Sequence, residues 1–108
     1  MEIPTYEESN LLRTNICQAL GDPKRILILY ALSESPHYVT ALSEVLDLPQ
    51  PTVSRHLSML RQRSLVKCER NGTAMVYRIA DERIMDVLET MRGLLRDIVD
   101  EAARSLET

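Results

Sequence analysis

Residues 40–63, TALSEVLDLPQPTVSRHLSMLRQR, contain two segments of helical character with a short turn between them. The first segment runs from Ala41 to Leu46. Thr40 is its expected cap, because a Thr hydroxyl accepts a hydrogen bond from a free N–H group of the first helical turn. Asp47-Leu48-Pro49 forms the turn, and the second segment is predicted to be a helix from Gln50 to Arg63.

The second of these helices separates apolar from polar side chains. Val53, Leu57 and Leu60 recur at spacings of four and three, which places them on one face of a helix. In the first helix, the residues expected to face inward are Leu42, Val45 and Leu46. The other faces of the second helix carry Gln50, Thr52, Ser54, Arg55, His56 and Arg61. A bracing helix followed by a helix with a buried face and a polar outer face is a helix-turn-helix.

The periodicity changes after residue 64. Residues 65–70 and 74–79 are short and contain β-branched residues and Tyr, as strands do. Between them lies Asn71-Gly72, a pair that tolerates the backbone angles of a tight hairpin turn. We therefore expect an antiparallel hairpin, or wing, over residues 65–79.

Two helices precede this motif. The first is expected over residues 6–20, with Gly21 as its stop. Asp22 and Pro23 open the second, because Asp caps free N–H groups and Pro fits the first helical position. The second helix is apolar on most sides and is predicted to lie at the centre of the core.

A long helix closes the chain, from Asp81 or Glu82 to Leu106. Its apolar positions follow spacings of 4, 3, 4, 3 and 4, which suits packing against another helix: Ile84, Leu88, Met91, Leu95, Ile98 and Ala102. Because the domain is small, we expect the apolar stripe of residues 82–106 to be buried by oligomerisation. The predicted fold is mainly α with a small β-hairpin, a dimeric winged helix-turn-helix of order ααααββα in one domain, 1–108.

Composition narrows the class of protein. The chain has 44% hydrophobic and 27% charged residues and no apolar run long enough for a membrane span. Its first residues lack the apolar stretch of a leader, so we expect a cytoplasmic protein without a membrane partner. Two cysteines are too few for a disulfide scaffold, and no catalytic arrangement is visible, so we expect no enzyme.

The charge is unevenly distributed. Residues 50–78 contain six basic residues and one acidic residue, a balance of +5 within a chain of net charge −3. Such asymmetry favours a local anionic partner, here double-stranded DNA. Amide, hydroxyl and guanidinium groups match base edges in the major groove, which selects Gln50, Thr52, Ser54, Arg55 and His56. Lys67 and Arg70 of the wing are expected to lie along phosphates.

Alternatives stand beside these assignments. The polar helix face is also compatible with plain solvation, and His56 with packing between helices as a neutral side chain. A winged helix that binds only proteins, without DNA, is the alternative function. Cys17 and Cys68 are either small core residues or a thiol switch.

Three stretches resemble the ArsR/SmtB family of repressors. Residues 20–29, LGDPKRILIL, resemble the family's entry motif, and residues 51–60, PTVSRHLSML, resemble its recognition helix. Leu65-Val66, Gly72 and Val76-Tyr77 resemble its wing. The resemblance covers nearly the whole chain. Pro49 and Pro51 depart from it, since Ser is common at those places.

The resemblance implies a homodimer held by the first and last helices, residues 6–20 and 82–106. The resemblance further implies that this dimer binds an inverted-repeat operator and leaves it when an inducer binds or oxidises the protein. It also implies that the groove contacts fall on the five polar residues named above. The family's common metal sites lack their ligands here, because residues 41–47 contain no Cys and the last helix contains no His. We therefore expect no metal and no cofactor, and Cys17 and Cys68 remain as a possible thiol switch.

Overall fold

The computed structural model of the chain describes residues 1–107. In chain order, its helices and strands are α1 (Tyr6–Leu12), a π-helical turn η1 (Arg13–Cys17), a 3-10 turn η2 (Ala19–Gly21), α2 (Pro23–Glu34), β1 (His37–Tyr38), α3 (Val39–Leu46), α4 (Gln50–Gln62), β2 (Val66–Asn71), β3 (Ala74–Ile79) and α5 (Arg83–Glu107). The predicted mainly helical fold with a β-hairpin is confirmed, with one additional short strand.

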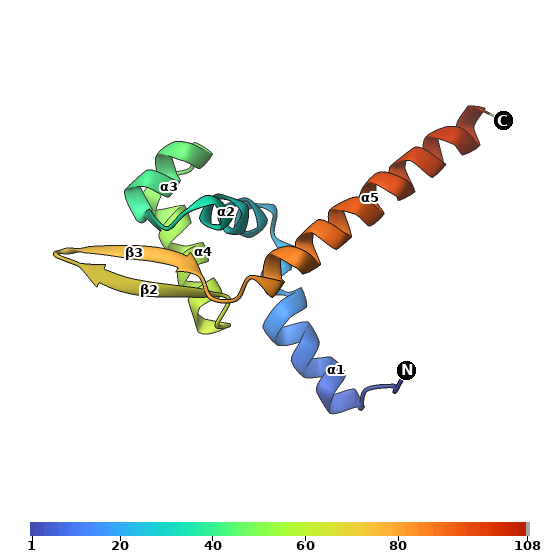
Figure 1. The fold of residues 1–108 in the computed structure, drawn as a ribbon, viewed down its shortest axis with the longest axis horizontal. Coiled ribbons are helices and arrows are strands. Elements are labelled where there is room, and N and C mark those ends of the chain that lie inside the picture. Colours follow the sequence, from blue (N-terminus) through green and yellow to red (C-terminus); the bar gives the residue numbers. More distant parts are fainter. Residues whose placement is uncertain (108) are drawn as a thin grey trace.

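The core lies between α2, α3, α4 and the base of the hairpin, and α1 and α5 extend away from it (Figure 1). Its fully buried large side chains are Ile28, Leu29, Leu42, Val53, Leu57, Leu60, Val66 and Leu88. The radius of gyration is 16.6 Å, whereas a compact domain of this length has about 13 Å. The two protruding helices account for the difference.

The first helix is shorter than predicted. Instead of one α-helix over residues 6–20, α1 ends at Leu12 and is followed by the turns η1 and η2. The Thr14 hydroxyl donates to the carbonyl of Asn10, and Nδ2 of Asn15 donates to the carbonyl of Leu11 at 2.9 Å. Side chains that bond to carbonyls one turn back compete with the helical ladder and distort it.

The second helix begins as predicted. Oδ1 of Asp22 accepts a hydrogen bond from the backbone N of Lys24 at 2.8 Å, and Pro23 occupies the first turn. This capped start sets the direction of α2, which supplies the middle of the core.

The third helix begins one residue before Thr40, and Thr40 is not its cap. Tyr38 holds the capping position without a side-chain bond, because His37 and Tyr38 form β1 immediately before the helix. The expectation that Val45 faces inward was also wrong, since its side chain is 63% exposed. Asp47 ends α3 with a φ of 52°, and the turn to α4 follows.

The wing is a three-stranded antiparallel sheet in the order β1-β3-β2. Tyr77 of β3 lies opposite Cys68 of β2 on one side and His37 of β1 on the other. Gly72 makes the hairpin turn with a φ of +67°, which costs little in a residue without a Cβ. His37 is therefore a strand residue.

The last helix leaves most of its apolar stripe uncovered within one protomer. Only Met85 and Leu88 of α5 are buried. The exposed apolar residues are Val87, Met91, Leu94, Leu95, Ile98, Val99 and Leu106. Among residues 1–107, no helix combines the length and the apolar character needed to cross a membrane.

Candidate nucleic-acid interface

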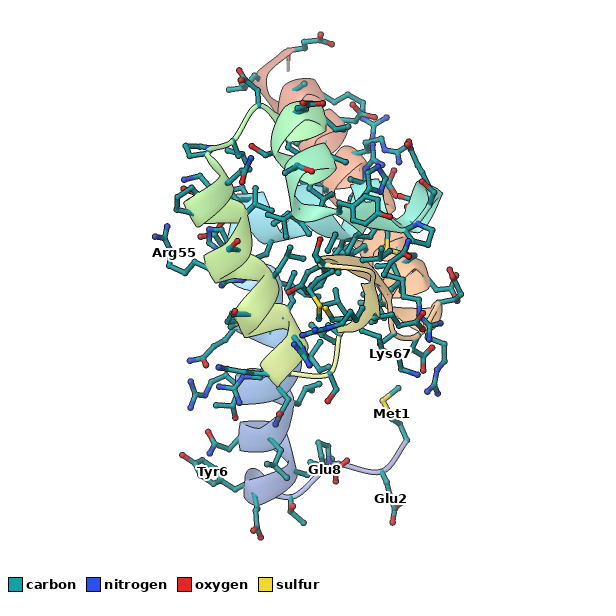
Figure 2. The ribbon with its side chains drawn as sticks, turned by 90° about the vertical axis from the view of Figure 1, so that its left-hand side faces the viewer. Met1, Glu2, Tyr6, Glu8, Arg55 and Lys67 are labelled. Atoms are coloured by element: carbon teal, nitrogen blue, oxygen red, sulfur yellow. The ribbon has the colours of Figure 1, made fainter. Side chains whose placement is uncertain are left out.

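Helix α4 is fixed to the core by the stripe predicted for it. Val53, Leu57 and Leu60 are fully buried, so the opposite face of the helix is turned outward. Figure 2 shows Arg55 pointing away from the helix into solvent. The polar residues on this outer side are Gln50, Ser54, Arg55, Ser58, Arg61 and Gln62, which are exposed, and Thr52, which is half-buried.

The first turn of α4 has free N–H groups. Pro49 precedes the helix and offers no side-chain cap, and the first turn carries no acidic residue. Neither a capping side chain nor an acidic residue of the first turn offsets the positive end of the helix dipole, which favours an anion in front of it.

His56 does not belong to the outer face, and its expected place there was wrong. The side chain is 7% exposed, and its Nδ1 lies 3.2 Å from Nη1 of Arg25. Because residue 56 follows Val53 by three positions, the helical repeat turns it toward the core. The alternative of a histidine packed between helices fits this position. Burial is the main cause that lowers the pKa of His56 below 6.5, so the ring is neutral at neutral pH.

The wing carries two cations, Lys67 and Arg70, that form no close ion pair within residues 1–107. Lys67 and Arg70 are exposed on β2, and Figure 2 shows Lys67 on the surface of the hairpin. Nη2 of Arg78, by contrast, lies 2.8 Å from Oε1 of Glu69. Within residues 1–107, no carboxylate oxygen lies within 4.0 Å of Arg55, Lys67 or Arg70. Charge counting along the sequence missed the pairing of Arg78, which depends on strand register.

The end of the wing is tied to the start of α3. Nδ2 of Asn71 donates to the Tyr38 hydroxyl at 2.8 Å, and β1 pairs with β3 directly beside it. Burial is the main cause that raises the pKa of Tyr77, which faces Cys68 in the sheet. These contacts link the orientation of the wing to the helix-turn-helix.

The two cysteines are free thiols in different surroundings. Cys17 is exposed on η1, and Cys68 is half-buried in β2, between the exposed Lys67 and Glu69. The core position offered as an alternative for Cys17 does not fit its exposure in the protomer. In the part of the chain that the structure describes, no group of three or more His, Cys, Asp or Glu side chains could hold a metal ion.

A braced helix with a polar outer face, followed by a basic hairpin, defines the class of winged helix-turn-helix DNA-binding proteins. The model of bacterial regulatory proteins of the arsR family matches residues 22–67. An uncharacterized HTH-type transcriptional regulator of Methanocaldococcus jannaschii is 37% identical over 80 residues, which are 73% of this chain and 90% of that relative. The chain belongs to the ArsR family of regulatory proteins.

Two further comparisons agree with this family membership. The HTH-type transcriptional repressor SmtB of Mycobacterium tuberculosis is 38% identical over 73 residues, which are 68% of this chain. That match spans 54%, about half, of the length of SmtB. The crystal structure of NolR from Sinorhizobium fredii has a TM-score of 0.74 at 29% identity, over 87% of this chain and 96% of NolR. The winged helix-turn-helix fold is thereby confirmed.

Proposed function

We propose that this chain is a homodimeric transcriptional repressor that binds an inverted-repeat operator and is released from it by an inducer or by thiol oxidation. The observation that carries the proposal is the outer face of α4, where amide, hydroxyl and guanidinium groups are exposed, together with the exposed Lys67 and Arg70 of the wing. A repressor named among the relatives, SmtB, supports the direction of regulation.

Four side chains are assigned to base edges: Gln50, Thr52, Ser54 and Arg55. Arg is suited to guanine, whose O6 and N7 accept two hydrogen bonds from one guanidinium, and the amide of Gln is suited to adenine. Lys67 and Arg70 are assigned to phosphates, which position the protein without reading sequence. His56 is left out because it is buried.

The dimer is assigned to α1 and α5. On α5, Leu94 is 59% and Ile98 is 56% exposed, and both belong to one continuous apolar stripe. An exposed apolar stripe of this length on a protruding helix is stabilised by burial against a second copy. Two copies place two α4 helices on one side of a duplex, as an inverted repeat requires.

Release by oxidation rests on Cys17 and Cys68, which are both unpaired. Mass spectrometry of the reduced and peroxide-treated protein, combined with DNA titrations of each, tests it. The thiol route requires weaker DNA binding by the oxidised form, and equal affinity of both forms leaves release to an inducer.

The function as a whole is tested by selecting duplexes from a random library with the purified protein. Light scattering then measures its size, and titrations against rising salt measure its affinity. We expect a dimer, a palindromic selected sequence and a steep loss of affinity with salt. A protein that ignores duplex DNA at low salt would favour the alternative of a protein-binding winged helix.

A further inference from the structure

Arg25 makes three hydrogen bonds that join distant parts of the chain. Its Nε donates to the carbonyl of Ala19 at 2.7 Å, and its Nη2 donates to the carbonyl of Gln18 at 2.8 Å. Its Nη1 lies 3.2 Å from Nδ1 of His56, in the middle of α4. The Arg25 guanidinium therefore contacts both the backbone that follows α1 and η1 and helix α4, which carries the polar outer face.

In the hydrogen bond between Arg25 and His56, the chemistry of the two side chains determines which group donates. A guanidinium has no acceptor atom, so Nδ1 of His56 must accept and the ring proton must be on Nε2. The Arg25 side chain is 15% exposed, which shields the bond from water. A planar guanidinium can serve several acceptors in a fixed geometry, whereas the ammonium of Lys acts as one point donor.

We propose that Arg25 is a positioning residue for DNA reading, which acts through His56 to hold α4 in a fixed orientation relative to the segment after α1. The proposal rests on the proposed function, in which α1 and α5 set the separation of two α4 helices. Base contacts require aligned donors and acceptors, and two half-sites must be met at once. Phosphate contacts tolerate small rotations, so a misplaced α4 loses preference for sequence before it loses affinity for DNA.

The test compares two duplexes, one selected by the wild-type protein from a random library and one with the same bases scrambled. The variants are Arg25→Met, Arg25→Lys, His56→Leu, His56→Asn and the double variant Arg25→Met/His56→Leu. Lys24→Gln is the matched control, because it removes the neighbouring positive charge of an exposed side chain. Circular dichroism at the titration temperature establishes that each variant is folded.

Arg25→Met and His56→Leu should each lower the affinity for the selected duplex relative to the scrambled one at least about tenfold. Each variant removes the hydrogen bond between the charged Arg25 and His56. The scrambled duplex should be bound as by the wild type. The double variant should lose no more than either single variant, because both interrupt one connection. Arg25→Lys should lose the preference as well, His56→Asn should retain part of it through its amide oxygen, and Lys24→Gln should retain all of it.

Several results would overturn the proposal. Rescue by Arg25→Lys would mean that charge alone matters, and additive losses in the double variant would mean that the two residues act separately. A salt slope reduced by about one on the scrambled duplex would make Arg25 a phosphate contact. If Arg25→Met is unfolded, Arg25→Lys and His56→Asn decide the question. A wild-type protein that selects no sequence contradicts the proposed function itself, a result distinct from all of these.

Discussion

At the scale of single residues, Arg55 and His56 are neighbours in sequence with opposite roles. One residue of helix turns the side chain by about 100°, and this step separates an exposed guanidinium from a buried imidazole. Both residue types are polar and both follow the turn, so composition alone does not separate them. Their angular positions on the helix, relative to the buried Val53, Leu57 and Leu60, do separate the two residues.

Replacing Ser54 and Arg55 by Ala should weaken binding of the selected duplex more than binding of a scrambled one. A lost bidentate base contact costs about 1–3 kcal/mol, or roughly 5- to 150-fold in affinity. Arg70→Ala is the comparison, because loss of a phosphate contact should weaken both duplexes alike. Titrations of both duplexes provide the check, and an equal loss on both after Arg55→Ala contradicts base reading by Arg55.

Acid should destabilise the protein through His56. Its pKa is lowered below 6.5 in the fold, first by burial, then by the Arg25, Arg55 and Lys24 charges, with Asp22 acting in the opposite direction. Below pH 6.5 the unfolded chain binds a proton that the folded chain resists, so the free energy of unfolding falls as pH drops toward the lowered pKa. Well above pH 6.5 the histidine is unprotonated in both the folded and the unfolded chain, so it no longer makes the free energy of unfolding depend on pH.

Urea unfolding of the wild type and of His56→Asn at pH 7.5 and 5.5 measures this effect. The decrease in unfolding free energy between these two pH values should be smaller in the variant. The same decrease in both proteins would contradict the role of His56.

At the scale of elements, the charge that the wing presents depends on the register between its strands. Register brings Glu69 opposite Val76 and leaves its carboxylate 2.8 Å from Arg78. The pair is exposed and contributes little to stability, but it neutralises Arg78, which lies opposite Lys67 in the sheet, next to a cation assigned to phosphates.

Glu69→Gln should release Arg78 and increase affinity for every duplex several-fold at low salt. The slope of affinity against salt should steepen by up to about one, because one more phosphate can be neutralised. Glu8→Gln removes the same charge on α1 and serves as the control. Unchanged affinity and slope in Glu69→Gln, measured by fluorescence anisotropy, would place Arg78 away from the DNA.

At the scale of the whole molecule, α1 and α5 extend from the body and leave apolar side chains in water (Figure 1). The molecule measures 58 × 38 × 21 Å, an elongated shape that one small core does not explain. In the proposed dimer, assembly of two copies would bury the stripe and set the separation of the two α4 helices.

Ile98→Glu should separate the dimer, because it places a charge in the proposed interface. Burial of each large aliphatic side chain there contributes about 1.5–3 kcal/mol to association. Light scattering should show a single chain and DNA titration a loss of at least tenfold, while circular dichroism still reports helices. Thr90→Glu adds the same charge on α5 outside the stripe and should leave the dimer intact. A dimeric Ile98→Glu protein would place the interface elsewhere.

Local chemistry in the sequence alone determined α4, the start of α2 and the hairpin turn. Spacings of three and four, an Asp-Pro pair and an Asn-Gly pair act within one or two turns of backbone, so neighbouring residues suffice to predict them. The tertiary structure alone decided β1, the ion pair of Arg78 and the contact between His56 and Arg25. Each of these needs a partner far away in sequence, and only the folded chain brings the two together.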